Sequence, residues 1–200
     1  SQNKLAWMYE KGVGVPKDEP QAVRWYQAAA ENNLPAAQNN LAWMYENGVG
    51  VTQSYASARN WYLKAAEVGY LKSQNSVARM YQKLGQDCEA ASWYQRAMRG
   101  NHADAGMALA SLYEAGHCPE ATPGQDQNVL AYDLYRNAAN KGNKEAMVKV
   151  GMSLLSGTGA AIDICQGIEW INKAERKKAS IPTDQITELG INGDTVENCH

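Results

Sequence analysis

The residues best suited to catalysis or metal binding are the histidines and cysteines of this chain. His117 stands next to Cys118, and Cys199 next to His200. Either pair could in principle act as a Cys–His nucleophile or as zinc ligands. However, neither has CxxC-type spacing, and adjacent residues rarely bind one metal together. No acidic pair lies in an apolar stretch that would shift its pKa. We therefore expect no catalytic residue, no metal and no cofactor.

Two glycine pairs, Gly12 with Gly14 and Gly48 with Gly50, superficially resemble phosphate-binding loops. A phosphate site of that kind also needs a preceding strand and either a third glycine or a Lys-Ser/Thr pair, and neither pair has these companions. Glycine readily adopts the positive φ that ends a helix. We interpret both pairs as turns between helices.

Charge and composition exclude further classes of function. The chain has 19 Lys and Arg against 21 Asp and Glu, a formal net charge of −2. This balance argues against nucleic-acid binding, which draws its affinity from a basic surface. No segment approaches the ~18–20 uninterrupted apolar residues of a membrane span, so we expect no membrane insertion. Because the chain starts without Met, we expect a processed or truncated product that lacks its targeting segment.

An internal repeat sets the positions of these residues. Leu5–Glu10 and Leu41–Glu46 share the sequence LAWMYE at an offset of 36, and Val77–Tyr81 follows after another 36. A second landmark, an aromatic pair after a small residue, recurs at spacings of 36, 32, 41 and 36. These spacings indicate a deletion around 84–88 and an insertion within 118–128. The predicted units are 1–36, 37–72, 73–104, 105–145 and 146–181, with a capping tail at 182–200.

Each unit is predicted to form two helices. Small and apolar residues recur at helical spacing, as Ala37, Leu41 and Tyr45 do in the second unit. We call this first helix of a unit helix A, and the glycine turn ends it. Asp18, Ser54 and Asp163 stand where helix B must begin, and their side chains can cap its free N–H groups. Sustained alternation of apolar and polar residues is missing, so strands are not expected.

The repeat resembles the Sel1-like repeat family, a relative of tetratricopeptide repeats. The family pattern reads A-x3-L-G-x2-Y-x2-G-x-G-V and then A-x2-W-Y-x2-A-A. The first two units match it almost throughout, whereas the third and fourth are degenerate. The resemblance implies an all-α fold, a right-handed α-solenoid of helix-turn-helix repeats whose A helices line a concave groove. It also implies a non-catalytic adaptor or scaffold for protein complexes, of a type that is often bacterial and exported.

The same resemblance predicts which side chains face the groove. If Leu5, Ala6 and Tyr9 face the core, unit positions 3, 7 and 10 face the groove. The three columns are Asn3, Asn39, Asn75, Met107 and Val148; Trp7, Trp43, Arg79, Ser111 and Met152; and Glu10, Glu46, Gln82, Glu114 and Leu155. The groove is thus expected to be polar and aromatic at its N-terminal end and apolar at its C-terminal end.

The asparagine column is the main functional signal. A carboxamide donates and accepts hydrogen bonds, as a peptide backbone does, and the neighbouring tryptophans can stack on a ligand. A protein or extended peptide is therefore predicted to bind at Asn3, Trp7, Asn39, Trp43, Glu46, Asn75 and Arg79. The alternative is that these residues are inherited family template or ordinary solvated surface. The remaining tryptophans, Trp25, Trp61, Trp93 and Trp170, lie in the predicted helices B and are predicted to belong to the core.

The four cysteines bear on the redox compartment. In the repeat register, Cys88 and Cys118 fall in A–B turns of adjacent units. Cys165 starts the last helix B, and Cys199 lies in the tail predicted to cover that repeat. Bridges Cys88–Cys118 and Cys165–Cys199 would suit a periplasmic or secreted protein. Four unpaired thiols in a cytoplasmic protein are the alternative.

Two other functions stay open at this point. One is an enzyme, a hydrolase or β-lactam-binding protein of the cysteine-rich Sel1-like type, which would need a nucleophile with a base. The other is a structural oligomer that self-associates through the first repeat, because Ser1 begins at a unit boundary without a capping helix.

Overall fold

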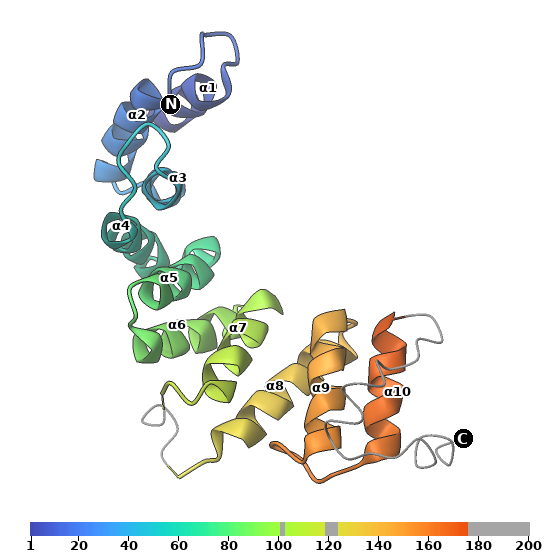
Figure 1. The fold of residues 1–200 in the computed structure, drawn as a ribbon. Helices are drawn as coiled ribbons and strands as arrows, with labels where there is room; N and C mark the ends of the chain where they lie inside the picture. The colour runs from blue at the N-terminus through green and yellow to red at the C-terminus, as the bar shows by residue number, and fades with distance from the viewer. Residues whose placement is uncertain (101–102, 119–123, 176–200) are drawn as a thin grey trace. The chain divides into compact units, whose positions relative to one another are not determined.

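The fold is all-α (Figure 1). The computed structural model describes residues 1–100, 103–118 and 124–175, and every regular element in these ranges is a helix. The predicted tail at 182–200 lies outside the described residues. The chain divides into two compact units, residues 1–102 and residues 103–200. Each unit has its own stack of helices.

The first unit contains three helix pairs. From α1 to α6, each helix packs against its neighbours in the chain within this unit, so that a pair buries its apolar faces against adjacent helices. The pairs are α1 (Gln2–Lys11) with α2 (Glu19–Glu31), α3 (Pro35–Asn47) with α4 (Tyr55–Glu67), and α5 (Leu71–Lys83) with α6 (Asp87–Arg99).

The second unit contains two helix pairs. Successive helices pack on each other here as well, and the last pair encloses a cluster of Leu155, Ile168 and Ile171. The pairs are α7 (Ala103–Glu114) with α8 (Gln127–Asn140), and α9 (Lys144–Ser156) with α10 (Ile164–Glu175).

The three predicted caps begin helices B as expected. The Asp18 carboxylate accepts from the Gln21 N–H at 2.9 Å, and the Ser54 hydroxyl accepts from the Ser57 N–H at 3.1 Å. The Asp163 carboxylate accepts from the backbone N–H three residues later at 2.9 Å. Each side chain satisfies an N–H that the first helical turn leaves without a carbonyl partner.

The core combines small residues with tyrosines. Ala22, Ala58 and Ala90 are fully buried and begin the helix-B segments that carry the aromatic pairs. Their small side chains let the helices approach closely, while Tyr26 and Tyr62 fill the space four residues further on and are at most 2% exposed. The predicted helical register thus buries the alanine and the tyrosine that recur in these helices.

The glycine pairs are turns, and Gly50 of the second pair also lies against the preceding repeat. Gly50 has φ +68°, and a Cβ there would lie 2.5 Å from the carbonyl carbon and oxygen of Glu19 at the start of α2. Gly14 has φ +74°, but the nearest atom to a Cβ at that position is Met8 Cε at 3.5 Å. Glycine is therefore required at Gly50 for backbone contact between repeats as well as for the turn.

Candidate functional site

The A helices of the first unit bring six of the predicted binding residues to equivalent positions. On each of α1, α3 and α5 an asparagine precedes a larger residue by four positions, so both lie on one face of the helix. Trp7 is 43% exposed and Trp43 is 41% exposed. Arg79 has the third equivalent position, and its side chain is 47% exposed. We call this set the A-helix surface; it consists of Asn3, Trp7, Asn39, Trp43, Asn75 and Arg79.

The side-chain oxygens of Asn3 and Asn39 accept hydrogen bonds from the next A helix. The Ser73 hydroxyl donates to Oδ1 of Asn39 at 2.9 Å, and Nδ2 of Asn40 donates to Oδ1 of Asn3 at 3.4 Å. Oδ1 of Asn75 is buried without a hydrogen bond to any described residue. The amide donors of Asn3 and Asn39 make no hydrogen bond within the described ranges. These two carboxamides thus offer donors, rather than the donor and acceptor predicted for each.

Glu46 has both carboxylate oxygens engaged inside the protein. Arg79 Nη2 donates to its Oε1 at 2.7 Å, and the Tyr62 hydroxyl donates to its Oε2 at 2.8 Å. The Glu46 side chain is only 15% exposed. The sequence placed Glu46 in the binding site, and the structure gives it a positioning contact to Arg79. Binding of a partner by Glu46 itself stays a prediction.

The bond between Glu46 and Tyr62 recurs in other helix pairs. The helix-B tyrosine donates to the position-10 side chain of helix A in four repeats. The pairs are Tyr26 with Glu10 at 2.7 Å, Tyr62 with Glu46 at 2.8 Å, Tyr94 with Gln82 at 3.0 Å, and Tyr135 with Glu114 at 2.8 Å. Our sequence reading missed this ladder of bonds. The signal for it was the equal spacing of 16 residues from Glu10 to Tyr26 and from Glu46 to Tyr62.

Burial, with a carboxylate partner where there is one, holds these tyrosine hydroxyls in their neutral, donating form. Burial raises the pKa of Tyr94 to about 12. Burial, together with the neighbouring carboxylate, also raises the pKa of Tyr26 and of Tyr62 well above the ordinary value. These tyrosine hydroxyls therefore stay protonated and can donate at neutral pH.

Only some of the residues predicted to form the apolar C-terminal end of the groove are exposed. On α9, Val148 is 37% exposed, but Leu155 is 6% exposed and belongs to the cluster with Ile168 and Ile171. The expectation that Leu155 faces a groove is therefore wrong. Its side chain instead fills the space against α10, where the other repeats place a polar position-10 side chain on a tyrosine.

The helix-B tryptophans are half-buried rather than fully enclosed. Trp25 and Trp61 pack against the buried cluster of the first three helices, and Trp61 and Trp93 pack against a second cluster formed by α3, α4 and α5. Cations cover several of these rings: Lys64 Nζ lies 4.1 Å from the Trp61 ring centre, and Arg96 Cζ lies 4.4 Å from that of Trp93. Trp170 also lines a hollow of about 300 Å³ beside α10.

The three cysteines in the described ranges are disulfide-bonded. They are Cys88, Cys118 and Cys165, whereas Cys199 lies outside those ranges. Cys118 is fully buried, and Cys165 is in the first turn of α10 as predicted. Cys88 was expected in a turn but lies within α6, because the shortened turn ends at Gln86. The pairing Cys88–Cys118 and Cys165–Cys199 stays a prediction.

The other candidates for chemistry gain no support as a metal site. In residues 1–100, 103–118 and 124–175, no group of three or more His, Cys, Asp or Glu could hold a metal ion. Helices in the same ranges also lack the combined length and apolar character that a bilayer span requires.

Helix pairs that stack through repeated small residues and tyrosines define a helical-repeat protein. The Sel1 repeat family matches residues 1–34, 35–70, 103–143 and 144–177, more than half of the chain. The chain belongs to the Sel1 repeat family. The predicted resemblance and the predicted all-α solenoid class are thereby confirmed. Residues 71–102, which include α5 and α6, lie outside the matched segments.

Two crystal structures of bacterial proteins are similar to this chain. A Sel1 repeat protein from Oxalobacter formigenes has a TM-score of 0.75 at 26% identity, over 99% of this chain and 84% of that one. The protein c5321, a protective antigen present in uropathogenic Escherichia coli strains and displaying an SLR fold, has a TM-score of 0.54 at 26% identity, over 96% of this chain and 50% of that one. This chain thus spans about half the length of the antigen. No curated protein matches it significantly.

Proposed function

We propose that this chain is a non-catalytic protein-binding scaffold whose A-helix surface holds an extended segment of a protein partner. Membership in the Sel1 repeat family supports the general activity, because Sel1 repeats generally mediate protein interactions. The observation that carries the site is the pair Trp7 and Trp43. Both indoles are about two-fifths exposed at equivalent positions of consecutive repeats, and exposed tryptophans of this kind are typical anchors of protein interfaces.

The asparagines supply the complementary polar contacts. Because Oδ1 of Asn39 is held by Ser73, its Nδ2 donors are available to the carbonyl oxygens of a bound backbone. The side-chain bonds from Asn40 to Asn3 and from Ser73 to Asn39 show that consecutive A helices touch. Touching helices lie ~8–10 Å apart, and an extended polyproline-like chain rises ~3.1 Å per residue. About three ligand residues would therefore pass each repeat.

Arg79 extends the same surface with a charge. Its bond to Glu46 fixes one end of the guanidinium, which has five N–H donors in total. The remaining donors can meet an acidic or carbonyl group of the partner, while Tyr62 holds Glu46 in place. We expect the bound segment to have an acceptor group opposite Arg79 and apolar or proline residues opposite the two indoles.

A location outside the cytoplasm, in the periplasm or secreted, is part of this proposal. The disulfide bonds of Cys88, Cys118 and Cys165 support it, because disulfides persist mainly in oxidising compartments.

The test uses substitutions that separate binding from folding. A partner captured from the native host is first purified, and its affinity is then measured by calorimetry against each variant. Asn39→Asp keeps an oxygen for Ser73 but removes the Nδ2 donors, so it should weaken binding by roughly 1–3 kcal/mol. Trp43→Ala should weaken binding at least as much. Neither change should lower the melting temperature by more than a few degrees.

Trp61→Ala is the matched control for loss of an indole. Trp61 packs against both buried clusters of the first two pairs, so its removal should destabilise the fold by roughly 3–5 kcal/mol. Partner binding by the fraction that stays folded should change little. If Asn39→Asp and Trp43→Ala both bind the purified partner with wild-type affinity, the A-helix surface is not the binding site.

A further inference from the structure

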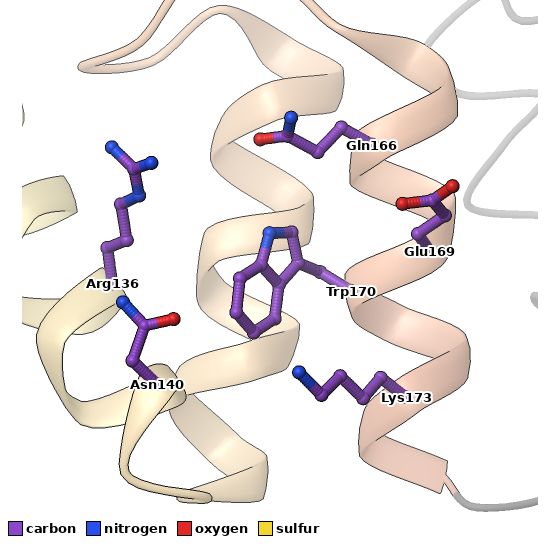
Figure 2. A pocket seen from close by; sticks show the side chains of 6 residues that line it. All are labelled: Arg136, Asn140, Gln166, Glu169, Trp170 and Lys173. Atoms are coloured by element: carbon purple, nitrogen blue, oxygen red, sulfur yellow. The ribbon is translucent and has the colours of Figure 1, made fainter.

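A second candidate site lies in the other unit, between two helices B. It is the hollow of about 300 Å³ lined by Arg136 and Asn140 of α8 and by Gln166, Glu169, Trp170 and Lys173 of α10. In Figure 2 the side chains of Gln166, Trp170 and Lys173 extend from α10 toward α8, and Arg136 and Asn140 border the opposite side. We call this hollow the Trp170 pocket.

The charges that face the Trp170 pocket are positive. Lys173 Nζ lies 4.8 Å from the Trp170 ring centre, and Arg136 lies across the pocket from α10 (Figure 2). Neither cation forms a salt bridge with any residue that the structure describes. The acid of the lining, Glu169, keeps its carboxylate beside α10 and does not extend toward α8 as its three α10 neighbours do.

The repeat register shows that the Trp170 pocket differs in charge from the equivalent positions of the first two repeats. A cation three residues after the tryptophan is a recurring feature, as Lys64 and Arg96 demonstrate. In the first two repeats, however, the positions equivalent to Asn140 are Glu31 and Glu67, which put an acid on the facing helix. The positions equivalent to Arg136 are the uncharged Gln27 and Leu63. At the α8–α10 junction an acid has thus become an amide, and an uncharged residue has become an arginine.

We propose that the Trp170 pocket binds an acidic side chain of a protein partner. A guanidinium matches a carboxylate in a paired geometry, and Lys173 adds a second positive charge. Gln166 and Asn140 supply carboxamides that can donate to and accept from the backbone on either side of the acidic residue. The indole covers the stem of that side chain. Charge complementarity therefore selects an acidic segment, and a hollow of this volume suits one or two side chains.

The test follows the Trp170 indole N–H by NMR in the full chain, with the signal assigned by Trp170→Phe. The probe is a capped tetrapeptide, acetyl-Gly-Glu-Glu-Gly-amide, and its glutamine counterpart is the control. The acidic peptide should shift the Trp170 signal in a saturable way that weakens as salt is raised, and the glutamine peptide should not. Arg136→Ala and Lys173→Ala should each weaken binding about three- to tenfold. Asn140→Glu, which restores the acid of the first two repeats, should weaken it at least tenfold.

Lys64→Ala is the matched control, because Lys64 also covers a helix-B tryptophan but faces a different junction. It should leave the Trp170 response unchanged, as should Trp43→Ala. The two proposals therefore fail separately. Equal shifts with the glutamine peptide, or full binding by Arg136→Ala and Asn140→Glu, would overturn the acidic ligand. Binding of free glutamate as tightly as the peptide would identify a small carboxylate and overturn the assignment to a protein partner. The side chains of Arg136, Asn140 and Lys173 are exposed and that of Trp170 is half-buried. A melting curve for each variant checks that it is folded.

Discussion

The hydroxyl of Tyr62 donates a hydrogen bond of 2.8 Å to Oε2 of Glu46, joining α4 to α3 within one repeat. Through Oε1 of the same carboxylate, Arg79 joins the pair to α5 of the next repeat at 2.7 Å. The carboxylate therefore connects three successive parts of the solenoid. Because the tyrosine is 2% exposed, water cannot easily replace its hydroxyl as a donor.

Tyr62→Phe should destabilise the first unit by about 1–2 kcal/mol, because the mostly buried Glu46 loses a donor while the ring is kept. Thermal unfolding followed by circular dichroism measures the effect. Tyr81→Phe is the control. Its ring also packs against the core and lies under Arg59, but its hydroxyl makes no hydrogen bond with any residue that the structure describes. The change should therefore cost less than ~0.5 kcal/mol. Equal losses in both variants would contradict a role for the Tyr62–Glu46 bond.

The fold could be predicted largely because repeated sequence and helix geometry point to the same register. The caps Asp18 and Ser54 and the glycine after α3 are local signals, and each acts within one or two turns. Local signals fail where the repeat is altered. Cys88 entered α6 because the shortened turn moved the helix start, and neither the residue types nor the period indicates where that start falls.

The candidate site could be predicted only as a set of positions. Helical spacing places Asn39 and Trp43 on one face, and the structure exposes the indole as expected. Helical spacing does not reveal that Ser73 donates to the side-chain oxygen of Asn39, because that contact joins two repeats. Leu155 shows the same limit: its position in the repeat predicts the groove face, but an apolar side chain gains more by burial against Ile171. The Trp170 pocket likewise depends on which side chains face each other across α8 and α10.

Stability should depend on Glu114 at acid pH. Burial opposes its charge, but hydrogen bonds from Lys149 and Tyr135 outweigh that effect and hold the pKa of Glu114 below the ordinary value of 4.5. Because the pKa is lower in the folded than in the unfolded state, the stabilisation is complete above the ordinary value and is lost as the pH falls through the lowered value. The Glu114 side chain is 42% exposed, so screening limits its contribution to less than ~1 kcal/mol.

Glu114→Gln should accordingly melt slightly below wild type at neutral pH, and the difference should shrink as the pH falls below the ordinary value and through the lowered pKa of Glu114. Asp133→Asn, which removes an exposed carboxylate on α8, is the control for the loss of one negative charge. Melting curves at several pH values measure both variants. A Glu114→Gln deficit that stays constant or grows toward acid pH would contradict the assignment.

Free thiols should be close to zero when the protein is unfolded in denaturant without reductant, since Cys88, Cys118 and Cys165 are disulfide-bonded. Mass spectrometry of the unreduced digest should then find Cys88 linked to Cys118, and Cys165 linked to Cys199. These two bridges would close loops of about 30 and 34 residues. Disulfides that close loops of this length contribute roughly 3–4 kcal/mol each when unstrained, so reduction should lower the melting temperature strongly. Four reactive thiols would contradict both the bridges and the proposed location, and a different linkage would contradict the pairing alone.

Gly50→Ala should destabilise the first unit more than Gly14→Ala, although the two glycines have the same place in the repeat. Both have a positive φ, +68° and +74°, so alanine costs each about 1–2 kcal/mol in backbone conformation. Only at Gly50 does the new methyl also meet the backbone of Glu19 at 2.5 Å. A backbone contact cannot relax as the end of a flexible side chain does, and overpacking of this kind costs a further ~1–3 kcal/mol.

The comparison isolates the contact between repeats, because the cost of the turn itself appears in both variants. Thermal melting gives the two differences, and hydrogen exchange at the start of α2 shows where the loss occurs: Gly50→Ala should speed exchange there, and Gly14→Ala should not. Equal melting temperatures for the two variants would show that the turn conformation alone requires glycine. The close approach of the second repeat to Glu19 would then contribute nothing measurable to stacking.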